Sequence, residues 1–191
     1  MPAGHRPRMN LALFGFGFVV AVTTAMIVLF AAMHLVTFPR LREMAGGLSP
    51  FDLRFLGYDR GDAVALLRAL GSEGRAEYLR VQLRLDDAFA PTYGVALSLA
   101  LAEILGRAGL GRRLAFLLAF ALVLPTAGFD IAENAAIAEM LRRPPDALDV
   151  QLVATASFRT TAKWGCAALG GGIALLGIFL ANHRRDREFD A

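Results

Sequence analysis

Three chemically versatile residue types are nearly missing from this chain of 191 residues: cysteine, histidine and lysine. The single cysteine, Cys166, excludes a disulfide framework and also thiol–disulfide catalysis, which needs a cysteine pair. Of the three histidines, only His34 lies away from the chain ends, so haem ligation between helices is not expected. The His-Glu-x-x-His motif of zinc proteases does not occur either. The sequence therefore favours neither redox nor zinc-protease chemistry.

Lysine is present once, as Lys163, whereas every other basic residue among the 20 Lys and Arg is arginine. Because this chain otherwise always uses arginine, the lone lysine indicates a position that needs either a compact point charge or a titratable amine. The formal net charge of +3 and the arginines flanking the apolar segments favour contact with anionic lipids. Nucleic acid is not an expected partner.

Hydrophobic residues make up 56% of the chain, above the roughly 45–50% of soluble proteins. They are concentrated in four segments that contain few charges, residues 11–36, 88–105, 114–136 and 161–181. A spanning helix needs about 20 residues, and such segments are too long and uniform for barrel strands. The sequence therefore predicts an all-α polytopic membrane protein, a four-transmembrane-helix bundle that forms a single membrane domain over residues 1–191.

Residues 39–87, between the first two spans, are expected to lie outside the membrane as a helical loop. Their charge is mixed and balanced, with eight Arg and eight Asp or Glu. Within residues 59–71, Val64, Leu67 and Leu70 recur about every third position, which predicts a short amphipathic helix that ends at Gly71. A further helix is expected to start after Gly71 and to continue into the second span.

Short basic segments indicate the orientation of the spans. They lie at both chain ends and in the loop between the second and third spans, at Arg6, Arg8, Arg107, Arg112, Arg113, Arg184, Arg185 and Arg187. The positive-inside rule places such segments on the cytoplasmic side. We therefore expect a bacterial cytoplasmic (inner) membrane protein with both termini in the cytoplasm.

The unusual polar residues of the spans are predicted to gather in one layer near the opposite membrane surface. Counting about 20 residues per crossing from the arginine-flanked side brings them to nearly the same depth as His34. Helical spacing makes Asp86, rather than its neighbour Asp87, the inward-facing residue. A charge at the bilayer centre costs about 2.5–3.5 kcal/mol, which favours inward-facing, paired side chains. The predicted cluster comprises Tyr78, Gln82, Asp86, Tyr93, Asp130, Glu133, Asn134, Arg159 and Lys163.

This cluster supports two main interpretations. In the first, it forms a polar pocket roofed by the 39–87 loop that binds a small polar molecule or a lipid headgroup. The carboxylates would then be ligands or acid–base groups, Lys163 an anion contact, and the tyrosines and Asn134 hydrogen-bond partners. In the second, the protein is a structural or assembly subunit, and pairs such as Asp130–Lys163 or Asp86–Arg159 only fix the helix packing.

Other chemistries are open at this point. Proton-coupled transport would use an acidic group within the membrane, and Asp130 is the deepest candidate. His34 together with the carboxylates offers the ligand types of a di-metal site, but Lys163 would compete with the metal. We therefore expect no metal and no cofactor.

Small residues are frequent in the last span, at Gly165, Gly170–Gly172 and Gly177. Such residues allow helices to approach closely, so they predict a helix–helix contact. Trp164, at the start of this span, is typical of an anchor at the membrane surface.

The run YLRVQLRLDDAFAPTYG at residues 78–94, followed by P-x-x-x-x-D-I-A-E-N at residues 125–134, resembles an uncharacterised family of small bacterial four-span membrane proteins. That family is associated with a tyrosine–aspartate–aromatic–tyrosine run and an Asp-x-x-Glu-Asn signature in the third span. The matching positions are Tyr78, Asp86, Phe89, Tyr93, Asp130, Glu133 and Asn134. The resemblance covers about residues 58–165 and implies the four-span architecture, but no activity.

Overall fold

The computed structural model describes residues 11–189, with side chains from residue 15 to residue 185. This part of the chain consists of helices joined by short loops. Four helical segments are long and apolar enough to cross a membrane, at Gly15–Met44, Arg60–Arg107, Arg112–Arg142 and Val150–Arg185. The predicted all-α fold with four spans is thereby confirmed. The side chains of Arg6, Arg8 and Arg187 lie outside the described residues.

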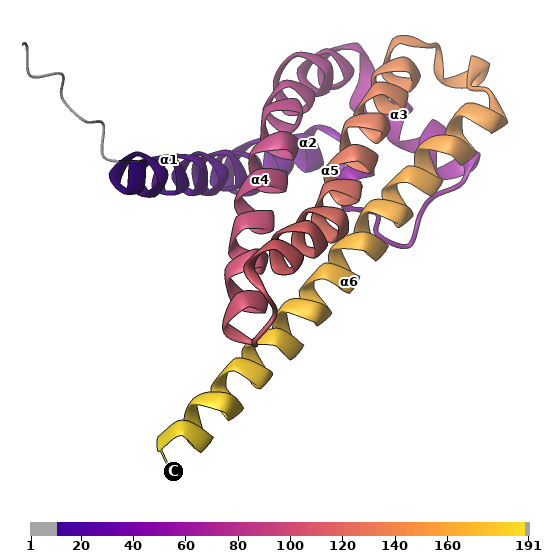
Figure 1. The fold of residues 1–191 in the computed structure, drawn as a ribbon. Coiled ribbons are helices and arrows are strands. Elements are labelled where there is room, and N and C mark those ends of the chain that lie inside the picture. The colour runs from indigo at the N-terminus through magenta and orange to yellow at the C-terminus, as the bar shows by residue number, and fades with distance from the viewer. Residues whose placement is uncertain (1–10, 190–191) are drawn as a thin grey trace, which may run out of the picture.

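The centre of the bundle is formed by α4 (Leu83–Arg107) and α5 (Arg112–Arg142). The long α6 (Val150–Phe189) packs along both of them, whereas α1 (Leu11–Ala32) packs mainly on α4. Figure 1 shows α4, α5 and α6 side by side, with α1 standing apart at one side. The outermost helices are therefore α1 and α6.

The outer surfaces of α1 and α6 are apolar. Ile27 and Val28 on α1, and Leu169 and Leu175 on α6, are all more than half exposed. Contiguous exposed apolar surface of this kind is typical of a face that contacts lipid or a partner. Together with the lengths of the four helices, it supports a multi-pass membrane protein.

The segment between α1 and α4 folds into a compact cap over one end of the bundle. It contains α2 (Phe38–Met44) and α3 (Arg60–Glu77). A capping box starts α3, because the Asp59 side chain accepts from the Asp62 backbone N–H at 2.8 Å and the Asp62 side chain accepts from the Asp59 N–H at 3.2 Å. The helix breaks at Gly71, whose φ of 60° ends the first helical stretch where the sequence predicted it.

The apolar face of α3 holds the cap on the bundle. Leu66, Leu67 and Leu70 are buried in one hydrophobic cluster with Ile137 and Met140 of α5. The buried face is rotated around the helix relative to the prediction, because Leu66 is fully buried and Val64 only partly. This packing fixes the cap directly above the polar layer.

Two π-helical turns lie side by side where the chain enters and leaves the cap. They span Met33–Thr37 and Tyr78–Gln82. The Thr37 hydroxyl donates to the side-chain carbonyl oxygen of Gln82, and both side chains are buried. Such turns are uncommon and often lie at functional sites.

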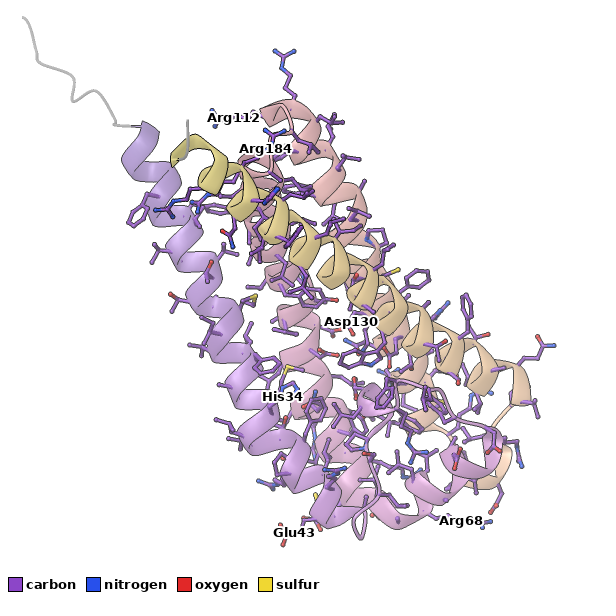
Figure 2. The ribbon with its side chains drawn as sticks, turned by 90° about the horizontal axis from the view of Figure 1, so that it is seen from below. His34, Glu43, Arg68, Arg112, Asp130 and Arg184 are labelled. Atoms are coloured by element: carbon purple, nitrogen blue, oxygen red, sulfur yellow. The ribbon has the colours of Figure 1, made fainter. Side chains whose placement is uncertain are left out.

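The two ends of the molecule differ in charge. Figure 2 shows Arg112 and Arg184 at one end, and Glu43 and Arg68 at the other. The Arg184 guanidinium packs directly on Gly109 in the loop between α4 and α5. The basic segments at residues 107–113 and 184–185 therefore share one end, whereas the mixed-charge cap and the pair Arg142–Arg143 occupy the other.

Candidate ligand-binding site

A cavity of about 630 Å³ lies between α1, α4, α5 and α6. Its wall is polar near the cap and apolar over the remainder. The polar end is lined by Asp52, Asp86, Asp130 and Lys163. The apolar part extends toward the basic end of the bundle and is lined by residues that include Leu97, Leu101, Ile104, Val123, Gly170 and Ala174. Because α1 packs mainly on α4, the cavity has an open side between α1 and α6.

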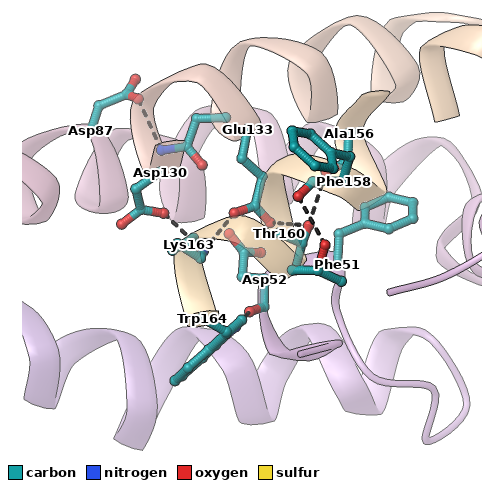
Figure 3. Close-up of polar contacts among 12 residues, drawn as sticks. Phe51, Asp52, Asp87, Asp130, Glu133, Ala156, Phe158, Thr160, Lys163 and Trp164 are labelled. Carbon is teal, nitrogen blue, oxygen red and sulfur yellow. Dashed lines mark hydrogen bonds and ion pairs between the residues drawn. The ribbon is translucent and has the colours of Figure 1, made fainter. Parts of the chain in front are cut away.

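Lys163 lies at the centre of the polar end. Its ammonium nitrogen is 2.8 Å from Asp130 Oδ1 and 2.6 Å from Glu133 Oε2 (Figure 3). These two acids are one turn apart on α5, so a single ammonium on α6 bonds to both. Thr160, one turn before Lys163, donates to the other Glu133 oxygen at 2.7 Å. The four residues are at most 8% exposed, and their side chains join α5 to α6 away from water.

This geometry accounts for the only lysine of the chain. A compact ammonium with three donors fits between two carboxylates, whereas a planar guanidinium has a fixed fork geometry. Because two of those donors already contact Asp130 and Glu133, Lys163 has little capacity left for the anion contact expected from the sequence.

The cap contributes a carboxyl group that the sequence analysis missed, that of Asp52. The Tyr78 hydroxyl accepts from the Phe51 backbone N–H at 3.0 Å and donates to Asp52 Oδ2. The Trp164 indole N–H donates to the Asp52 main-chain oxygen at 3.1 Å. Figure 3 shows that these contacts bring Asp52 beside Lys163 and Glu133. The other carboxyl oxygen, Asp52 Oδ1, is buried and has no hydrogen-bond partner.

Asp86 of α4 is the second carboxyl group with a free oxygen. It lines the cavity, is 3% exposed, and its Oδ2 has no hydrogen-bond partner. Its neighbour Asp87 is exposed and accepts from the Asn134 side-chain amide at 3.1 Å. Asp86 is thus the inward-facing member of the pair, as the helical spacing predicted.

Aromatic rings form the wall beside these carboxyl groups. Phe30 and His34 of the first span stack at 3.9 Å between ring centroids, and Phe89 and Tyr93 of α4 lie 4.9 Å apart. Phe30 and Phe89 connect the two pairs at 6.1 Å. A hydrogen bond of 3.1 Å between His34 Nδ1 and the Phe30 carbonyl oxygen ties the imidazole to its own helix. Among the described residues, no group of three or more His, Cys, Asp or Glu is placed to hold a metal ion.

The predicted site residues take three different positions. Asp86, Tyr93, Asp130 and Lys163 line the cavity. Tyr78 and Glu133 lie behind it and bond to residues that do. Gln82 and Asn134 are buried at the margin, where they contact Thr37 and Asp87.

Arg159 lies apart from the cluster, contrary to the prediction. Its guanidinium donates to the Ala132 main-chain oxygen at 2.7 Å and lines a shallow groove on the outer face with Glu139. Asp86 and Arg159 therefore do not form the ion pair that the structural interpretation of the cluster included. Arg159 is four residues before Lys163, so the two differ by about 40° in direction around α6. From this position the long Arg159 side chain turns toward the outer face.

The glycines of α6 mostly line space rather than contact a helix, which corrects the sequence prediction. A Cβ atom added at Gly165, Gly170, Gly171 or Gly172 would meet no atom within 4 Å, and Gly170 and Gly171 lie in the cavity wall. Gly177 is the exception, because its Cβ would lie 2.7 Å from Ile104. Gly170 and Gly171 thus leave room inside the bundle.

Gly57 fixes the Asp52 loop on α6. Its φ is 88°, and an added Cβ would lie 2.8 Å from Ser157 Oγ, the atom that accepts from the Tyr58 N–H. We expect Gly57→Ala to destabilise the protein by about 1–3 kcal/mol through strain alone, and by more through the clash. Unfolding in mixed micelles would measure this. Gly47→Ala, with a φ of 94° and open space around it, is the matched control. Equal losses of unfolding free energy in both variants would show that Gly57 does not pack tightly against Ser157.

Comparisons with known proteins do not assign this chain to a family. No protein-family model matches the chain, and no curated protein or solved structure matches it either.

Proposed function

We propose that this protein binds a small polar molecule or a lipid headgroup in the cavity between α1, α4, α5 and α6. The observation that carries the proposal is a pair of buried carboxyl oxygens, Asp52 Oδ1 and Asp86 Oδ2, which lack partners at the polar end of the cavity. Leaving a buried polar group without a partner costs about 1–3 kcal/mol, and more when it is charged. A bound ligand that donates hydrogen bonds removes this cost.

A structural or assembly subunit is the competing hypothesis. The contacts of Lys163 with Asp130 and Glu133 suffice to fix α5 against α6. They require neither the unpartnered oxygens of Asp52 and Asp86 nor an open cavity beside them. Ligand binding is favoured because it accounts for all of these features together.

Proton-coupled transport is less well supported. The acidic side chains that line the cavity, Asp52, Asp86 and Asp130, all lie at its polar end. The wall between them and the basic end of the bundle is apolar, so it offers no chain of titratable groups along which a proton would move.

We further propose that the protein lies in a bacterial cytoplasmic membrane with its basic end inside. Arg107, Arg112 and Arg113 flank the short loop between α4 and α5 at that end, and Arg184 lies near the end of α6. The opposite end carries the cap, with charges of both signs, and the pair Arg142–Arg143. The positive-inside rule then places both termini in the cytoplasm and the cap, with the polar end of the cavity, on the outer side.

The test compares Asp86→Asn with Asp87→Asn, its exposed neighbour on the same helix. Each protein is purified in mild detergent, and the molecules that it carries are identified by mass spectrometry. We expect the wild type and Asp87→Asn to retain the same compound and Asp86→Asn to lose it, with no loss of thermal stability. Retention of the same compounds by all three proteins, or of none by the wild type reconstituted with lipid extract, would contradict the proposal.

A further inference from the structure

The chemistry of the cavity wall also identifies a class of ligand, an inference that rests on the proposed function. We infer that the cavity takes a cationic amphiphile, with an organic ammonium head at the polar end and an alkyl chain along the apolar wall. Three independent features of the wall support this assignment: its charge, its aromatic rings and its length.

The polar end holds more carboxyl groups than cationic groups. Four carboxyl groups, those of Asp52, Asp86, Asp130 and Glu133, lie around one ammonium group, that of Lys163. Lys163 contacts only two of the four carboxyl groups at ion-pair distance. Because a buried carboxylate is stable only when paired, the remaining carboxyl groups can pair with a bound cation but not with a phosphate or carboxylate head. No arginine is among the residues that line this cavity.

The aromatic rings distinguish an organic ammonium from a metal ion. Phe30, Phe89, Tyr93 and Trp164 line the same end of the cavity as the carboxyl groups. Ring faces attract ammonium groups that lie within about 6 Å, and aromatic cages are a common means of binding quaternary ammonium. Hard metal ions instead require several oxygen ligands and gain little from such a wall. Carboxylates together with aromatic faces fit an alkylated ammonium.

The apolar part of the cavity has the length of an alkyl chain. Along α6 its wall extends from Lys163 to Ala174, a rise of about 16 Å at about 1.5 Å per residue. One leaflet of the hydrocarbon core is about 15 Å thick, half of about 30 Å. The ammonium head of the ligand therefore lies near the membrane surface, and its alkyl chain lies parallel to the lipid chains. The alkyl chain can reach the surrounding lipid through the open side between α1 and α6.

The only tryptophan of the chain reports on this site, because Trp164 lines the cavity one residue after Lys163. Three probes share an alkyl chain brominated close to its head and differ only in that head: trimethylammonium, hydroxyl or carboxylate. Bromine quenches tryptophan at short range. Each probe is titrated into the protein in phosphatidylcholine nanodiscs while Trp164 emission is recorded.

We expect saturable quenching by the ammonium probe, with a half-saturating concentration at least tenfold below those of the other two. Asp86→Asn should raise that concentration about tenfold, and Asp87→Asn should leave it unchanged. Gly170→Leu fills the apolar part and should abolish saturation, whereas Gly172→Leu, on an adjacent surface outside the cavity, should not. Both glycines have open space at Cβ, so both variants are expected to fold.

The outcomes separate this inference from the function on which it rests. Saturable quenching by the carboxylate or alcohol probe at concentrations equal to or below the ammonium probe would overturn the cationic assignment, while the cavity would still be a binding site. Quenching that is linear for all three heads, and unchanged in Gly170→Leu, would overturn the binding function as well. Gel filtration and thermal unfolding of each variant confirm that a lost signal reflects lost binding.

Discussion

Replacing Lys163 with methionine is expected to destabilise the protein by about 3–5 kcal/mol, the usual effect of removing one partner from a buried ion pair. The variant leaves Asp130 and Glu133 facing each other across one helical turn with no counter-charge, and both are almost completely buried. Reversible unfolding in mixed micelles, driven by a denaturing detergent, measures the difference in free energy of unfolding.

The structure also predicts how stability is recovered. Adding Asp130→Asn to Lys163→Met should restore only part of the loss, because Glu133 still lacks its partner. The triple variant that also carries Glu133→Gln should approach wild-type stability, since replacing a whole buried ionic group by neutral side chains is often close to neutral. Full recovery in the double variant would show that the second ion pair contributes nothing.

Truncation of Phe51 to alanine should produce an effect of similar size, about 3–5 kcal/mol. Phe51 is 0% exposed and packs between Tyr58 and Tyr78, at 4.8 and 6.3 Å between ring centroids. Its backbone N–H also donates to the Tyr78 hydroxyl. Because Asp52 is the next residue, loss of the Phe51 anchor should weaken ligand retention as well as stability.

Phe55→Ala is the matched control for this change, because Phe55 lies in the same loop and is 60% exposed. We expect it to leave the free energy of unfolding and the retained ligand almost unchanged. Hydrogen exchange should show faster exchange across the loop that carries Asp52 in Phe51→Ala only. Equal effects of the two substitutions would mean that Phe51 does not anchor the loop.

The spans and the depth of the polar layer were predictable because both follow from simple periodic rules. Charge-free stretches long enough to cross a bilayer mark the helices. Helical spacing then placed Asp86, Asp130 and Lys163 on inward faces, since a charge directed toward lipid is costly. These three residues line the same end of the cavity in the structure.

The residues that sequence reasoning missed or misplaced do not obey such rules. Asp52 belongs to a single 3₁₀ turn, Phe51–Leu53, whose position depends on distant contacts, those with Tyr78 and Trp164. A glycine such as Gly170 shows only that a side chain is missing. Glycines occur both at tight helix contacts and beside empty space, so the sequence does not distinguish the two. The direction of Arg159 depends on rotamers along a long side chain, which helical spacing does not determine.

The π-helical turn at Tyr78–Gln82 changes the direction in which the residues before and after it face around the second span. In a regular α-helix, residues eight apart differ by about 80° in direction, at about 100° per residue. Tyr78 and Asp86 are eight apart, yet both are buried at the site, because a turn that closes on the fifth residue absorbs part of this offset. The turn is thus equivalent to a one-residue insertion. Deleting a single residue here would restore a regular helix and rotate either Tyr78 or Asp86 out of the site.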